Sequence, residues 1–215
     1  MADQGYPEGA TPKNPFWSQP ARVWNSVMPV LERWTNMVLQ NAPRVVRLDA
    51  EPQVLIECDA SKWGYGCCML NRETGVAHSF GGPWPHEVKQ RFGEKLGEST
   101  FAEPFGVLLS LVKAREQFPE ATRFGVTNDN SVAVVAFTRR FNSHSWGINE
   151  CLRRADELFP QSEFSITMRK VAGVANMADG GSRGRVVNEM DGEQKLLLRS
   201  RWGSDVAENR EDASA

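Results

Sequence analysis

Residues 54–71, VLIECDASKWGYGCCMLN, decide the fold because they hold two β-rich runs separated by a short turn. VLIECD and GYGCCML have the length and composition of strands, and SKWG between them is typical of a turn. A third β-rich run, GVAHSF at 75–80, begins within a second turn, NRETG. Three strands joined by such short connections predict an antiparallel meander.

Downstream of the meander, helical and strand patterns alternate. Apolar residues at helical spacing predict a helix over 101–118, and RFGVT predicts a fourth strand. A helical segment (SVAVVAFTRRF), a second helical face over 148–159 and an alternating strand (EFSITMRK) follow. The segment around Pro83 and Pro85 is expected to be a loop. This order predicts the α/β class, with a mixed five-stranded sheet of three antiparallel strands and parallel additions, flanked by helices.

The remaining segments predict extensions around one domain. We expect a flexible lead-in over 1–21, a helical extension or polymerase-linking segment over 22–49, the domain itself over 50–187, a terminal helix within 188–202 and a disordered tail over 203–215. The extension carries Trp24 and Trp34, and Pro29 suits a first helical turn. Its apolar stripe could pack on its own domain, as such stripes usually do, or on a partner.

Composition places few limits on function. With 40% hydrophobic and 24% charged residues, the 215-residue chain resembles an ordinary soluble protein, and a net charge of −2 neither requires nor excludes nucleic acid. Four cysteines without a CxxC pair predict buried, reduced thiols. Without a signal peptide or an 18-residue apolar window, we expect an intracellular protein, cytoplasmic or nuclear, and no membrane span.

Four carboxylates are candidates for chemistry. Asp59 closes the first strand, Asp129 closes the fourth, Glu103 opens the long helix, and Asp179 lies in NMADGGSR. Singly, each has a structural interpretation: a turn or cap for the aspartates, and a favourable helix-end charge for the glutamate. Together they would repel one another and raise a pKa unless cations neutralise them. Such oxygen ligands suit Mg²⁺, and two ions about 3.5–4 Å apart can drive phosphodiester hydrolysis.

The strings DASKWGYG, AEPFGVLLSL, TNDNSVAVVAF and VAGVANMADGGSR resemble the ribonuclease H domains that follow reverse transcriptases, most closely those of DIRS-type and related LTR retroelements. The resemblance covers about residues 50–185. It implies two Mg²⁺ ions, with Mn²⁺ as a substitute, and hydrolysis that leaves a 5′-phosphate and a 3′-hydroxyl. By this resemblance Asp59 contacts both metals, Glu103 and Asp129 lie on the leaving-oxygen side, and Asp179 holds the metal that activates water.

The chain departs from that pattern in three places. Pro104 predicts that Glu103 lies just before the helix, and Thr100 with Glu103 also fits a purely structural capping box. Gly180 and Gly181 disfavour a helix, so Asp179 is expected on a loop. Cellular relatives carry a histidine in the loop before the final aspartate, and VAGVANMA has none.

Residues near these motifs are candidates for contact with an RNA–DNA hybrid. Ser61, Lys62 and Gly64 could read 2′-hydroxyls in the minor groove, and Asn130 and Ser131 could do the same or cap the helix. Basic residues interleaved with Phe141 and Trp146 could contact phosphates, unless they form a solvated helix face. These basic candidates are Arg139, Arg140, His144, Arg153 and Arg154.

The leading hypothesis is a metal-dependent endonuclease that cuts the RNA strand of RNA–DNA hybrids, as part of a reverse-transcribing element or a derivative, with a polymerase domain as a possible partner. The alternative is a domesticated or inactive module that binds nucleic acid or an assembly partner. An integrase or exonuclease on the same fold is less compatible with NMADGGSR. Stabilisation by Mg²⁺ would separate the first two hypotheses.

Overall fold

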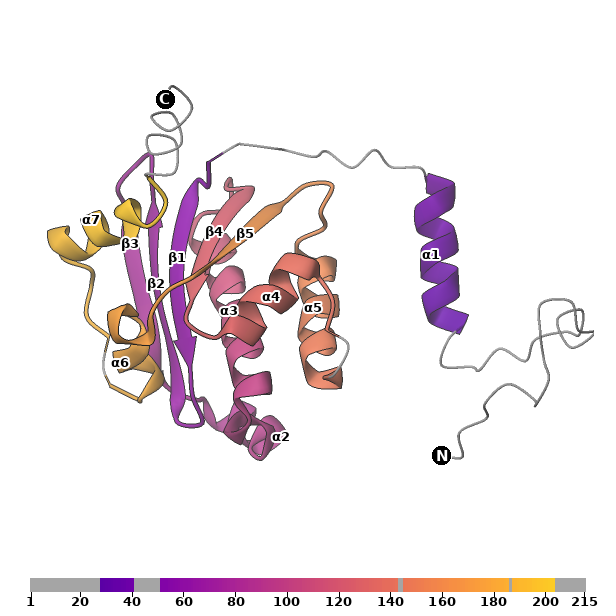
Figure 1. The fold of residues 1–215 in the computed structure, drawn as a ribbon, viewed down its shortest axis with the longest axis horizontal. Helices are drawn as coiled ribbons and strands as arrows, with labels where there is room; N and C mark the ends of the chain where they lie inside the picture. The colour runs from indigo at the N-terminus through magenta and orange to yellow at the C-terminus, as the bar shows by residue number, and fades with distance from the viewer. Residues whose placement is uncertain (1–27, 41–50, 143–144, 186, 204–215) are drawn as a thin grey trace, which may run out of the picture. The chain divides into compact units, whose positions relative to one another are not determined.

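β1 (Val54–Ala60) is buried along its whole length, as its apolar sequence predicts for a central strand. The computed structural model describes residues 28–40, 51–142, 145–185 and 187–203. The other strands are β2 (Gly64–Asn71), β3 (Ala77–Pro83), β4 (Arg123–Asn128) and β5 (Ser165–Lys170). Their order is β3-β2-β1-β4-β5, with β1, β2 and β3 antiparallel and β4 and β5 added in parallel (Figure 1). The predicted mixed five-stranded sheet is confirmed.

Three helices cover one face of the sheet: α3 (Ser99–Gln117), α4 (Ser131–Arg139) and α5 (Trp146–Leu158). Val54, Ile56 and Cys58 point from β1 into this larger core. The expected loop before α3 instead contains α2 (His86–Phe92) and η2 (Lys95–Gly97). A helix forms there because Val88 and Phe92, one turn apart, both pack against the core.

The opposite face is covered by two short helices from the C-terminal part, α6 (Asp179–Ser182) and α7 (Gly192–Ser200), and η3 (Gly173–Ala175) precedes α6. Leu198 and Trp202 pack there against Leu55 and Leu70 of the sheet. Asp191 and Gln194 form a capping box at the start of α7. The helix predicted within 188–202 therefore contributes a second, smaller core.

The described residues divide into two compact units, one of residues 28–40 and one of the described part of 51–203. In the first, α1 (Met28–Gln40) is an amphipathic helix with exposed Leu31, Trp34 and Leu39, and whether it packs on its own domain stays a prediction. Predictions for 1–21, for Trp24 and for the tail beyond Gly203 lie outside the described residues. All four cysteines are free and buried. No described helix is both long and apolar enough to cross a membrane.

Two glycines allow α6 to lie directly on the sheet. A Cβ on Gly66 would lie 2.1 Å from the carbonyl oxygen of Ala178, and a Cβ on Gly181 would lie 2.8 Å from the Cα of Gly66. Gly66 is also the partner of Asp59 in the β1–β2 register. This close approach therefore brings the start of α6, and with it Asp179, towards the end of β1.

The adjacent glycines of α6 should respond oppositely to alanine. Gly181→Ala should lower the free energy of unfolding by about 1–3 kcal/mol, because its Cβ would meet backbone that cannot move easily. At Gly180 nothing lies within 4 Å of the added Cβ, so Gly180→Ala should be neutral or stabilising by up to about 1 kcal/mol. Urea unfolding measures both, and equal effects would mean that α6 is not docked on β2.

Candidate active site

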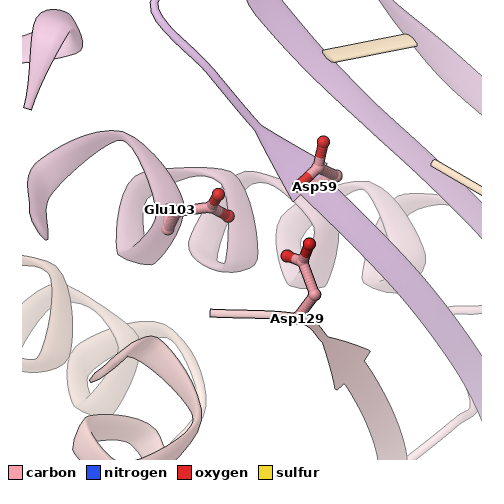
Figure 2. Close-up of side chains that lie close together, drawn as sticks. All are labelled: Asp59, Glu103 and Asp129. Atoms are coloured by element: carbon pink, nitrogen blue, oxygen red, sulfur yellow. The ribbon is translucent and has the colours of Figure 1, made fainter. Parts of the chain in front are cut away.

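Three carboxylates converge where β1 and β4 end: Asp59 from β1, Glu103 from α3 and Asp129 just past β4 (Figure 2). One oxygen from each lies within 4.8 Å of the others. Asp59 and Glu103 are buried, and Asp129 is half-buried. We call these three residues the acidic triad.

Asparagine side chains complete the sheet edge beside the triad. The β1–β4 pairing ends at Glu57 and Thr127, which leaves the Cys58 carbonyl beyond the ladder. The Nδ2 atoms of Asn128 and Asn176 donate to this carbonyl over 3.0 and 3.2 Å. Asn128 Nδ2 also lies 3.2 Å from Glu103 Oε2. The strand end and one triad carboxylate are thus held by neutral donors.

The prediction that Glu103 precedes the helix is wrong. α3 begins at Ser99, and Pro104 lies inside it, where it has no N–H to donate to the carbonyl one turn earlier. Burial of the first turns offsets this loss, and Gly106 allows close packing because its Cβ would lie 2.7 Å from the Cβ of Ala60. The capping box of Thr100 is also wrong, because Glu98 is the N-cap.

Asp129 is free of the capping role that its position suggested. Asn130 caps α4 instead, because its side chain accepts from the backbone N–H groups of Val132 and Ala133. The Asp129 carboxylate lies against the backbone of Gly173, where an added Cβ would come within 2.7 Å of Oδ2. Asp129 is therefore packed between the end of β4 and η3.

Asp179 stands apart from the triad. It opens α6 rather than a loop, so the expectation from the two glycines is wrong; the contact of Gly181 with β2 accounts for the helix. Its carboxylate accepts from Arg183 Nε over 2.8 and 2.9 Å. A cleft of about 340 Å³, lined by Asp59, Glu103 and Asp179 with Lys62, Trp63 and Arg183, connects it to the triad.

Burial and charge repulsion raise the pKa values of two carboxylates in the triad. Desolvation, with the charges of Asp129 and Asp179, raises the pKa of Asp59 to about 6, although the Ser182 side chain opposes the shift. Desolvation and the charges of Asp59 and Asp129 raise the pKa of Glu103 to about 8. Carboxylates are hard oxygen ligands, and these resist ionisation when no cation is present. The cluster therefore fits a divalent cation such as Mg²⁺.

The turn that follows Asp59 is organised by its own polar groups. Ser61 Oγ donates to the Ser182 carbonyl over 2.6 Å and accepts from Trp63 N–H. The Lys62 ammonium lies 4.7 Å from the centroid of the Trp63 ring. Gly64 is buried and serves the approach of β3, because its Cβ would lie 2.1 Å from the Gly82 carbonyl oxygen. Of the predicted groove contacts on this turn, Lys62 is the most exposed to solvent.

The other predicted nucleic-acid contacts that the structure describes lie on α4, directly after α4, or on α5. Ser131 and Arg139 are exposed on α4, whereas Arg140 is partly buried and pairs with Asp156 at 3.2 Å. On α5, Arg153 pairs with two glutamates and Arg154 pairs with Glu157 at 2.9 Å. These pairs match the solvated helix face that was the alternative interpretation. His144 lies outside the described residues.

Trp63 and Arg183 line the cleft, although sequence reasoning did not select them. Trp63 is 61% exposed next to Lys62. Arg183 follows Asp179 by four residues, which is the spacing of a helical ion pair. That spacing could have identified Arg183, but only if a helix had been predicted at the double glycine.

No protein-family model and no curated protein matches the chain. Solved structures similar to it include the N-terminal ribonuclease H domain of a Mycobacterium tuberculosis protein, with a TM-score of 0.49 and 19% identity over 62% of this chain and 98% of that one. Ribonuclease H1 of Halobacterium salinarum has a TM-score of 0.45 and 12% identity over 61% of this chain and 97% of that one.

A foamy viral protease–reverse transcriptase in complex with dsDNA is also similar, with a TM-score of 0.32 and 11% identity over 73% of this chain and 32% of that one. The mixed sheet with helices on both faces is a ribonuclease H-like fold. These likenesses are too distant to transfer an activity to this chain.

The raised pKa values make stability depend on pH. Without divalent cations, the folded protein holds protons on Asp59 and Glu103 that the unfolded chain has released, between about pH 4 and pH 8. The free energy of unfolding should therefore fall as pH rises through this window. Excess Mg²⁺ should raise the melting temperature more at about pH 8.5 than at about pH 5.5, where protons compete for the same oxygens.

Thermal melts of the wild type and of Glu103→Gln, with and without Mg²⁺, measure this dependence. The variant should show a flatter pH profile because it lacks the carboxyl with the higher pKa. A wild-type melting temperature that is independent of both pH and Mg²⁺ would contradict a cation-binding triad.

Proposed function

We propose that this chain is a metal-dependent ribonuclease H that hydrolyses the RNA strand of RNA–DNA hybrids. The convergence of Asp59, Glu103 and Asp129, the first two of which share a cleft with Asp179, is the observation that supports this proposal most directly. Similar sites on unrelated folds hold cations for other reactions, so the choice of a hybrid substrate depends also on the resemblance of the four sequence strings and on the fold.

In this proposal the triad and Asp179 hold two Mg²⁺ ions. When bound, the ions activate a water molecule and stabilise the leaving oxygen of an in-line displacement. Asp59 would contribute to both positions, because it lies in the triad with Asp129 and in the cleft with Asp179. Asp179 lines the cleft, and it would have to exchange Arg183 for a cation. Arg183 would then be available to a phosphate of the substrate.

The wider context is part of the same proposal. The resemblance favours a domain of a reverse-transcribing element of the DIRS or LTR type, or a derivative, with a polymerase domain as partner. A module that binds a hybrid without cleaving it is the second candidate. It is favoured by the ion pair between Asp179 and Arg183, which occupies one proposed ligand.

Cleavage of an end-labelled RNA–DNA hybrid in Mg²⁺ tests the proposal. The wild type should cut only the RNA strand and leave an all-DNA duplex intact. Asp129→Asn should lower the rate at least about a hundredfold, because a neutral amide is a poor ligand for Mg²⁺. Glu116→Gln is a matched control and should cut at the wild-type rate, because Glu116 is a surface carboxylate paired with Lys113. A folded wild type that binds the hybrid but cuts nothing in Mg²⁺ or Mn²⁺ would favour the binding module.

Binding of the hybrid should depend on the cleft more than on α5. In an Asp129→Asn background, Lys62→Gln should weaken binding and reduce the slope of log affinity against log salt by about 1, because Lys62 is exposed beside the cleft. Arg153→Gln should have a smaller effect, since Arg153 is already paired with Glu150 and Glu157. Fluorescence anisotropy at several salt concentrations measures both slopes, and a larger effect at Arg153 would place the substrate over α5.

A further inference from the structure

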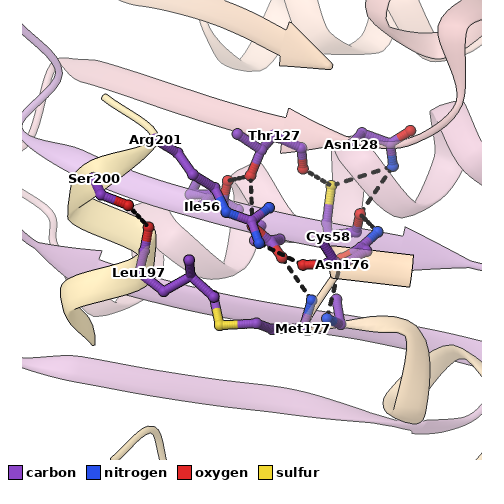
Figure 3. A network of polar contacts seen from close by, with 12 residues as sticks. Ile56, Cys58, Thr127, Asn128, Asn176, Met177, Leu197, Ser200 and Arg201 are labelled. Carbon is purple, nitrogen blue, oxygen red and sulfur yellow. Dashed lines mark hydrogen bonds and ion pairs between the residues drawn. The ribbon is translucent and has the colours of Figure 1, made fainter. Parts of the chain in front are cut away.

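A buried carboxylate lies two residues before Asp59 on β1. Glu57 has no solvent exposure, and its oxygens have three partners, Thr127, Met177 and Arg201, which Figure 3 labels. Oε1 accepts the Met177 N–H over 2.6 Å, and Oε2 accepts the Thr127 hydroxyl over 3.1 Å. Nη1 of Arg201 lies 2.5 Å from Oε2. Glu57 therefore joins the central strand to three segments that are distant in sequence: β4, the segment before α6 and the end of α7.

Arg201 extends this connection to the C-terminal helix. It follows α7 directly, its side chain is 12% exposed, and its Nη2 donates to the Ala175 carbonyl. Its own carbonyl accepts from Arg169 Nη1 over 2.6 Å, and the Arg169 guanidinium lies 4.6 Å from the centroid of the Trp202 ring. One arginine thus holds α7 against β1 and against η3.

The segment that this pair holds carries or contacts two proposed ligands. Gly173 at its start lies against the Asp129 carboxylate. Met177 near its end precedes Asp179 by two residues, and its N–H is fixed by Glu57. Asn176, between them, donates to the Cys58 carbonyl beside Asp59. The position of 173–179 relative to β1 is thus defined by contacts from Glu57, Arg201 and Asn176.

We propose that Glu57 and Arg201 are positioning residues that set Asp179 and support Asp129 relative to Asp59. The proposal rests on the proposed function only in taking these aspartates as ligands. A need for stability does not explain the pair, because replacing a buried ion pair with apolar side chains of similar size is often neutral or stabilising. The pair gives instead a fixed register between β1 and the segment that ends at Asp179, and it makes α7 part of the site.

Four variants test the pair. Arg201→Met removes the bond to Ala175 but leaves the Glu57 charge buried without its ion-pair partner, which by itself lowers the stability of the fold. Glu57→Met with Arg201→Met removes both charges and keeps an apolar fill. Glu57→Gln keeps an acceptor for the Met177 N–H. Arg199→Met is the matched control, because Arg199 also lies on α7 but donates to the Arg72 carbonyl, away from the cleft.

Two measurements that need no nuclease activity decide the outcome: hydrogen exchange of the 173–179 backbone amides, and Mn²⁺ affinity from electron paramagnetic resonance of the free ion. The double Met variant should expose the Met177 amide to faster exchange. It should also weaken Mn²⁺ binding about 10–100-fold, the usual effect of losing an outer-shell support. Glu57→Gln and Arg199→Met should each stay within about threefold of the wild type in Mn²⁺ affinity.

A folded double Met variant with unchanged exchange over 173–179 would overturn the proposal. So would an Arg199→Met variant that weakens Mn²⁺ binding as much as the double variant, since the effect would then come from loosening α7 in general. If the wild type binds no Mn²⁺ and cuts no hybrid, the proposed function fails. The exchange data would still decide whether Glu57 and Arg201 hold the segment.

Discussion

Mutual repulsion among carboxylates at a buried sheet edge is the constraint on which the rest of the site depends. Burial and neighbouring charges already raise the pKa values of Asp59 and Glu103 to about 6 and about 8. Ionising the whole cluster at neutral pH therefore requires compensating positive charge. The contacts around it supply only part of this compensation: amide N–H groups of Asn128 at Glu103, and Arg183 at Asp179. The cluster is best completed by cations that enter the cleft.

Close backbone packing brings these charges together. Gly106 lets α3 approach β1 near Ala60, Gly66 lets α6 lie on β2, and Gly173 lets η3 meet Asp129. At each of these contacts a Cβ would come within 2.7 Å or less of its neighbour. Each contact adjoins one of the proposed ligands, so the lack of a side chain serves the geometry of the site as well as the packing of the fold.

The sequence predicted the sheet well because each strand is marked by its own local pattern. It placed Asp59 and Asp129 correctly at strand ends, where period and turn chemistry are both informative. It misplaced Glu103 and Asp179 because local rules for Pro104 and Gly181 gave way to tertiary packing that no single segment encodes. The partnership of Glu57 and Arg201 spans 144 residues between positions 57 and 201, and no local pattern in either segment indicates it.

The ion pair of Asp179 with Arg183 is compatible with cation binding. Both side chains are substantially exposed, at 41% and 62%, and an exposed ion pair contributes little free energy, so exchanging it for a cation costs little. The triad behaves differently, because burial removes hydration from Asp59 and Glu103, and no helix cap or ion pair among the described residues offsets that cost for either carboxylate. A module that only bound nucleic acid would gain from replacing buried acids next to a phosphate backbone. Their presence in the cleft is therefore easier to reconcile with hydrolysis than with binding alone.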